Sequence, residues 1–231
     1  KALAGDTTYA KFLTDINGND LGYVDADGVP QVNLPKIMQI HKGSSKAYFL
    51  YENGMVSCSG HGADGLKGDG STSSRYYHFP IKFYDNSGTE LTGANYPKIT
   101  QMHISDAHTM DSTSNDYNGC YYFLDTEGKL YRFGYNGYGQ LGDGTTTNNY
   151  FNKQMPMSLF GGEKIVYITG TGYQYNSMYA ITETGKLWGW GRNNDGNLGL
   201  GNTTQQVTPQ HITGVSGSLL ENKKVIHVIA S

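Results

Sequence analysis

Three stretches of the chain alternate apolar and polar residues around a central turn, and they align with one another without a gap. These stretches are residues 47–60, 121–134 and 178–191. Alternation places successive side chains on opposite faces of a strand, and two such runs joined by a tight turn are typical of a β-hairpin. Each turn ends in a glycine, as expected where the backbone takes a positive φ that a Cβ would resist. We therefore predict three β-hairpins, with turns that end at Gly54, Gly128 and Gly185.

A second set of glycines follows each hairpin at a fixed spacing. The sets are Gly60, Gly65, Gly68 and Gly70; Gly134, Gly139, Gly142 and Gly144; and Gly191, Gly196, Gly199 and Gly201. A phosphate-binding loop would have to lead from a strand into a helix, and no helical period follows here. These glycines are therefore predicted to be structural. At one aligned position between these glycines, the second and third repeats have Leu141 and Leu198, whereas the first has Lys67. Repeat one therefore departs from the pattern of the other two.

A short apolar segment that begins with a lysine opens each repeat, and these lysines divide the chain. A repeat at such a period changes the choice of fold class, because each unit buries its apolar face against the next. We predict that 1–35 is the second half of a preceding repeat, 36–97 repeat one, 98–163 repeat two with an inserted loop at 106–119, 164–223 repeat three, and 224–231 the first strand of a further repeat.

The composition agrees with an all-β chain. Charged residues make up 16% of the 231 residues, and there are 32 glycines and 19 tyrosines. Long helices need more Ala, Glu, Lys and Leu than this, whereas short strands joined by glycine turns do not. The net charge of -3 and the pI of about 6.2 lack the basic balance of a nucleic-acid binder. No apolar run approaches the ~18 to 20 residues of a membrane span, so we expect neither nucleic-acid binding nor membrane insertion.

The hairpin, its aromatic-glycine ending and the following glycine set resemble the regulator of chromosome condensation repeat. The resemblance is most specific at Trp188-Gly189-Trp190-Gly191 and from Asn193 to Gly201, and also at Arg132-Phe133-Gly134. It implies a β-propeller, in that family roughly seven blades of four strands each. We expect about three full blades plus partial units at both ends. Three units do not close such a ring, so the resemblance also implies a segment of a longer chain or a larger assembly.

The sequence gives little support for a metal site or a disulfide. His41 and His103 share a column, but Thr169 and Ile229 fill it in the other repeats, and a metal site needs three or four convergent ligands. Cys58 and Cys120 lie on different strands of different repeats, so a disulfide between them is not expected. We predict no metal and no cofactor.

Candidate catalytic groups are equally sparse. Ser, His and Asp are scattered without the signature of a triad, and Asp on a glycine-rich loop is usually a turn residue. The pairs Asp64 with Asp69 and Asp111 with Asp116 could approach each other as in a glycosidase. We expect no enzyme, and a glycan-cleaving propeller that uses these loop carboxylates stays the rival hypothesis.

Tyrosines are the remaining signal, and they fall into two groups. One column, Tyr48, Tyr122 and Tyr179, is predicted to pack inside the blades. The loop tyrosines offer large amphipathic surfaces at low entropic cost, although packing over the blade rim is an equally good reading for any one of them. We predict them as the partner-binding residues: Tyr117, Tyr135, Tyr138, Tyr173 and Tyr175.

These features favour a non-enzymatic binding or structural module whose loops recognise a protein or a glycan. The uncharged Gly, Asn, Thr and Tyr-rich loops suggest an extracellular or virion-surface setting, such as a phage tail fibre or a bacterial adhesin. The resemblance also implies an alternative, an intracellular scaffold that regulates a small GTPase, which the acidic pI disfavours. A third hypothesis is that the blades only space other domains.

Overall fold

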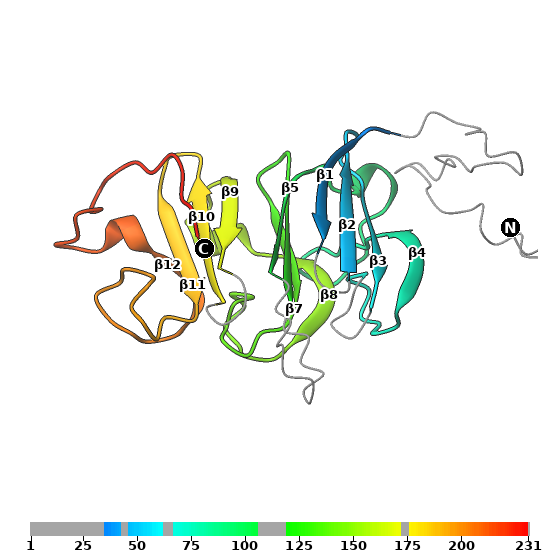
Figure 1. Ribbon diagram of the computed structural model, residues 1–231. Helices are drawn as coiled ribbons and strands as arrows, with labels where there is room; N and C mark the ends of the chain where they lie inside the picture. Colours follow the sequence, from blue (N-terminus) through cyan, green and yellow to red (C-terminus); the bar gives the residue numbers. More distant parts are fainter. Residues whose placement is uncertain (1–34, 43–45, 62–66, 106–118, 172–175, 231) are drawn as a thin grey trace, which may run out of the picture.

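The computed structural model describes residues 35–42, 46–61, 67–105, 119–171 and 176–230, which form three four-stranded antiparallel sheets. Figure 1 shows the sheets side by side in chain order, each nearly edge-on. Blade 1 contains β1 (Ile37–Lys42), β2 (Lys46–Tyr51), β3 (Val56–Gly60) and β4 (Arg75–Pro80). Blade 2 contains β5 (Ile99–Ser105), β6 (Cys120–Asp125), β7 (Leu130–Gly134) and β8 (Asn149–Gln154). Blade 3 contains β9 (Ile165–Gly170), β10 (Ser177–Thr182), β11 (Leu187–Gly191) and β12 (Gln206–His211).

Each blade follows one topology, with neighbouring strands paired in sequence order. The three predicted hairpins are confirmed as β2–β3, β6–β7 and β10–β11, in registers that pair Tyr48 with Cys58, Tyr122 with Arg132, and Tyr179 with Gly189. Short 3-10 helices follow the outer strands: η2 (Gly93–Asn95), η3 (Met157–Phe160) and η4 (Ile212–Gly214). The all-β propeller-blade architecture expected from the repeats is therefore what the chain forms.

The hairpin turns join one blade to the next, which explains why they require glycine. Gly54 has φ of 84°, and a Cβ there would lie 2.7 Å from the Cα of Lys98. Its carbonyl accepts a hydrogen bond from the Ile99 amide at 2.9 Å, and Gly128 accepts one from Ile165 at 3.1 Å. The turn glycine therefore serves both its own backbone conformation and the close approach of the next opening strand.

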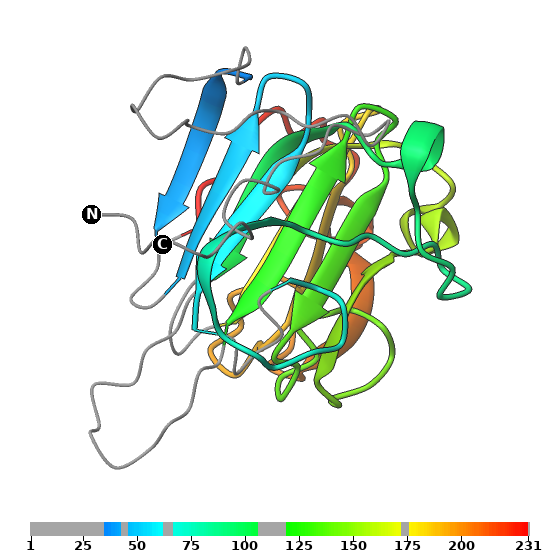
Figure 2. The ribbon, with the colours of Figure 1, turned by 90° about the vertical axis from the view of Figure 1, so that its right-hand side faces the viewer.

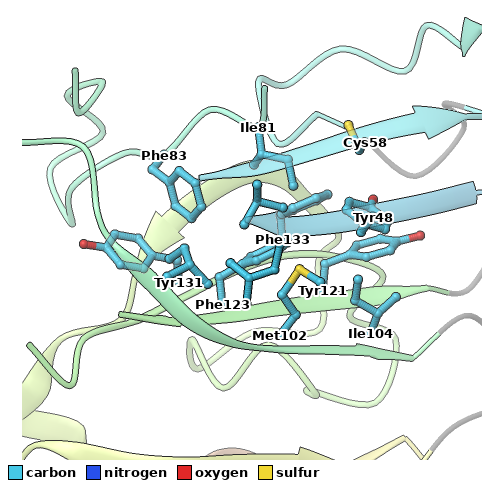
Figure 3. Packing of buried hydrophobic residues seen from close by; sticks show 13 residues of the cluster. Tyr48, Cys58, Ile81, Phe83, Met102, Ile104, Tyr121, Phe123, Tyr131 and Phe133 are labelled. Carbon is cyan, nitrogen blue, oxygen red and sulfur yellow. The ribbon is translucent and has the colours of Figure 1, made fainter. Parts of the chain in front are cut away.

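The blades pack face to face, with one behind another in the view of Figure 2, and two apolar layers fill the space between them. Between blades 1 and 2, Tyr48, Val56 and Phe83 meet a second set of side chains from blade 2 (Figure 3): Met102, Ile104, Tyr121, Phe123, Tyr131 and Phe133. Between blades 2 and 3, Tyr122, Leu124 and Leu141 contact residues of blade 3, chiefly Ile168, Met178, Ala180 and Trp190. Burial of these faces is the main stabilising contribution to the stack.

The predicted packing of the aligned tyrosines inside the blades is confirmed, and two of their hydroxyls also form hydrogen bonds. Tyr48 and Tyr122 are fully buried and Tyr179 nearly so. Tyr122 donates a hydrogen bond to the Gln140 carbonyl, and Tyr179 donates one to the Asn197 carbonyl at 2.8 Å. Both carbonyls belong to the glycine-rich loop of the same repeat, so the column ties the hairpin to its loop.

The outermost strands, β4, β8 and β12, close each sheet, and β8 and β12 receive the glycine-rich loop of the preceding blade. The Gly70 amide donates to the Tyr150 carbonyl at 3.0 Å, and the Gly144 amide donates to the Val207 carbonyl at 2.9 Å. In the loop itself, the predicted structural role of the glycines is confirmed, since those in the described residues that recur after each hairpin have positive φ. Hydrogen bonds therefore connect one blade to the next both at the hairpin turns and at the glycine-rich loops.

Residues 224–230 are in no strand, which differs from the opening strand expected at 224–231. A strand needs a neighbour for its ladder, and the described part of the chain provides none beside this segment. The segment still begins as its counterparts do, since the Val225 amide donates to the Gly185 carbonyl at 2.8 Å, and Val228 packs against blade 3. The partial repeat expected at 1–35 and the loop at 106–119 lie outside the described residues, apart from Pro35 and Gly119.

Cys58 and Cys120 are both buried and form no disulfide. Burial raises the pKa of the Cys120 thiol to about 12, so this thiol stays protonated and unreactive. Both cysteines act as small apolar residues in the layers between blades.

Candidate recognition face

Two of the five predicted loop tyrosines, Tyr135 and Tyr138, lie in the described residues, and they come together. Both are in the glycine-rich loop between β7 and β8, half-buried, with ring centroids 6.3 Å apart and planes at 72°. The guanidinium of Arg192 lies over the Tyr138 ring, 5.3 Å from its centroid. Tyr117, Tyr173 and Tyr175 lie outside the described residues. We call Tyr135, Tyr138 and Arg192 the aromatic cluster.

The loop that carries the cluster is held from within by Asn136, which is fully buried between the two tyrosines. Its side-chain oxygen accepts a hydrogen bond from the Leu141 amide at 2.8 Å, and its amino group donates to the Thr145 and Thr147 carbonyls at 3.1 Å. The Tyr138 amide is also bound, by the side-chain oxygen of Gln140 at 2.9 Å. These bonds fix the backbone on both sides, so the loop that carries the two rings is preformed.

Arg192 was not among the predicted site residues. It follows Gly191 directly, in the column that holds Tyr135 in repeat two and His61 in repeat one. That column could have been recognised as one of large, non-glycine residues at the rim of three blades. The contact with Tyr138 joins two blades, and it depends on their stacking rather than on any local pattern. The guanidinium of Arg192 over the Tyr138 ring is a cation–π interaction.

Of the four predicted loop carboxylates, Asp69 alone lies in the described residues, so neither predicted pair is tested. Asp69 is paired with Lys67 at 2.5 Å and accepts a hydrogen bond from the Ser71 amide at 3.0 Å. Burial raises the pKa of Asp69, but the hydrogen bonds from Lys67 and Ser71 outweigh it and lower the pKa below its usual value. Such a group stays ionised and is unsuited to donate a proton. Asp64, Asp111 and Asp116 lie outside the described residues.

The two histidines of the shared column lie close enough to affect each other. Burial, and then repulsion from His41, lower the pKa of His103 to about 4, so its imidazole is neutral at pH 7. A metal ion would need further ligands, and no group of three or more His, Cys, Asp or Glu side chains gathers anywhere in the described residues. In the same residues, no helix has the length and apolar content needed to cross a membrane.

Comparison with known proteins identifies the repeats. The regulator of chromosome condensation (RCC1) repeat matches residues 127–174 and 184–231. Each matched segment begins near a hairpin turn, so the boundaries of the matched repeats lie half a blade away from the boundaries of the four-stranded sheets. The ultraviolet-B receptor UVR8 of Arabidopsis thaliana is 28% identical over 204 residues, which cover 85% of this chain and 40% of the receptor. Human protein RCC2 is 38% identical over 36% of this chain and 15% of its own length.

A solved structure shares the arrangement of the sheets. Prp20p from Saccharomyces cerevisiae superposes with a TM-score of 0.53 at 14% identity, covering 80% of this chain and 40% of that one. At this identity the likeness concerns the fold alone. The chain thus spans about two fifths of the length of the receptor and of Prp20p. Residues 127–174 and 184–231 are repeats of the regulator of chromosome condensation type, and the three sheets are blades of a β-propeller.

Proposed function

We propose that this chain is a protein-recognition module without catalytic activity, which binds its partner through the loops that carry the aromatic cluster. The observation that supports this most directly is the arrangement of Tyr135, Tyr138 and Arg192 on a loop held by Asn136. Tyrosine and arginine are the residue types most enriched at the energetic centres of protein interfaces. A rigid loop that presents both gives a partner a large contact at a small ordering cost.

The relatives support a protein as the partner. Prp20p has been described with binding properties toward Gsp1p and histones, and bound to Kap60. A propeller of this fold thus binds proteins, which supports a protein as the partner of the present chain. A glycan is the second candidate, since stacked tyrosines also suit sugar rings. The phage tail fibre or bacterial adhesin setting stays a prediction, and the relatives reported above include no such protein.

Site-specific photo-crosslinking tests the proposal. A photoreactive aromatic residue replaces Tyr138 in one variant and Tyr167, an aromatic of the β9 strand outside the cluster, in a control. We expect a protein adduct at position 138 that Arg192→Ala weakens and that position 167 does not form. A glycan array probed with the same chain provides the counter-test. Glycan binding lost in Tyr138→Ala, with no protein adduct, would replace the protein partner by a sugar. Equal adducts at both positions would remove the aromatic cluster from the site.

A further inference from the structure

A polar pocket lies at the junction of blades 1 and 2, at the end of the blades opposite the glycine-rich loops. It has a volume of about 410 Å³. Leu91, Ala94 and Pro97 of the segment that links the blades form one wall. Asp125, Tyr131 and Gln154 of blade 2 form the other. Such a volume lies within the roughly 300 to 1,000 Å³ of small-ligand sites.

Asp125 places a buried carboxylate in this wall. It is 6% exposed, and its Oδ1 accepts the amides of Glu127 at 2.9 Å and Lys129 at 2.8 Å. Its Oδ2 has one partner, the Tyr131 hydroxyl, at 3.2 Å. Among the ion pairs of the described residues none includes Asp125, because the Lys129 ammonium is paired with Glu127 at 2.6 Å. The carboxylate is therefore desolvated without a cation of its own, and burial raises its pKa.

The next junction has different contacts at the corresponding place. Between blades 2 and 3, Glu163 precedes the opening lysine and binds both Lys186 and Thr184 of the facing turn. Phe160 is fully buried there, with its ring 5.8 Å from that of Trp188. At the first junction Pro97 precedes the opening lysine and brings no charge, and Lys129 pairs within its own turn. The second junction is bridged, whereas the first is left open beside Asp125.

We propose that this pocket binds one basic side chain, a lysine or arginine, of a partner protein. The cationic head would pair with Asp125 Oδ2 and offset the desolvation of the carboxylate. The aliphatic stem would lie against Leu91 and Pro97, as long cationic side chains cover apolar surface. Two lysines, Lys98 and Lys129, also line the pocket; Lys98 is exposed to solvent, and Glu127 neutralises Lys129. This site is separate from the aromatic cluster, so its test does not depend on the proposed function.

Titration of the isotope-labelled chain with small amides tests the site. The probes are Nα-acetyl-lysine amide and Nα-acetyl-arginine amide, with Nα-acetyl-norleucine amide as the uncharged match. We expect saturable shifts of the Glu127 and Lys129 amide resonances with the two basic probes, because both amides donate to Asp125. Norleucine should produce none.

Three variants test the site, and a fourth separates it from the aromatic cluster. Asp125→Asn keeps the Oδ1 acceptor for the turn and should weaken binding by roughly tenfold or more. Asp85→Asn is the matched control, because Asp85 accepts the Thr89 amide at 2.8 Å in a similar turn outside the pocket. Ala94→Trp should block the pocket while Asp125 stays in place. Equal binding of norleucine, undiminished binding by Asp125→Asn, or no saturable shift overturns the proposal. Tyr138→Ala should leave the titration unchanged, which separates this result from the test of the aromatic cluster.

Discussion

The opening strands of blades 1 and 2 carry the same sequence column in two different environments. Ile99 and Met102 of β5 face blade 1 and are 3% and 4% exposed. Ile37 and Ile40 of β1 occupy the same two positions one repeat earlier and are 44% and 59% exposed. Both pairs are apolar and both strands form the same ladder with the next strand. A repeat therefore supplies only half of each apolar layer, and the neighbouring blade decides whether that half is buried.

Shortening the side chain at one position of this column in both opening strands tests the comparison most directly. Met102→Ala should lower the free energy of unfolding by about 2 to 5 kcal/mol, because it leaves a cavity in a closed layer. Ile40→Ala should change it by less than about 0.5 kcal/mol, as at other exposed positions. Urea denaturation of the two variants beside the unaltered chain measures both. Equal losses would mean that another surface covers β1 in solution.

A glycine pair compares the same backbone conformation inside a junction and at an outer face. Gly142 has φ of 65° and Gly199 has 67°, so alanine costs each about 1 to 2 kcal/mol of left-handed strain. A Cβ at Gly142 would also lie 3.0 Å from the Trp190 ring, whereas at Gly199 nothing lies within 4 Å. We expect Gly142→Ala to lower the melting temperature more than Gly199→Ala, as differential scanning calorimetry would record. Equal shifts would show that the neighbouring blade does not constrain the loop.

The smallest expected effect concerns the ion pair that bridges blades 2 and 3. Hydrogen bonds from Lys186, Thr182 and Thr184 lower the pKa of Glu163 to about 2 from its ordinary 4.5. A depressed pKa means that the stabilisation is full above pH 4.5 and is lost as the pH falls toward 2. Because the pair lies near the surface, Glu163→Gln should cost less than about 1 kcal/mol at pH 7 and a smaller amount at pH 2, where part of the carboxyl is protonated in the folded chain. Unfolding curves at both pH values check this, and an equal cost at both would contradict it.

The hairpins and the glycine-rich loops could be predicted because their signals are local. Alternation marks the strands, and a positive φ restricts Gly54, Gly128 and Gly185 whatever lies around them. The outer strands β4, β8 and β12 were not found. In β8 and β12 few side chains are buried and alternation is weak, since only Asn152 and Pro209 are buried there. Their place in the sheet comes from pairing with the hairpin beside them.

The candidate site likewise has residues that the sequence could identify and contacts that it could not. Tyr135 and Tyr138 could be identified as loop tyrosines from their glycine-rich surroundings. Their contact with Arg192 could not, because it joins the ends of two different blades. Asp125 was also missed. It departs from Tyr51 and Thr182 in its column, but only the open junction beside blade 1 makes its carboxylate part of a pocket.

By itself, the sequence determined the repeat, the hairpins and the family, because alternation and glycine conformation act over a few residues. The tertiary structure decided which faces are buried, which junction stays open and which side chains meet at the blade ends. Those outcomes depend on how one blade stacks on the next, and near-identical columns such as Ile40 and Met102 carry no record of it.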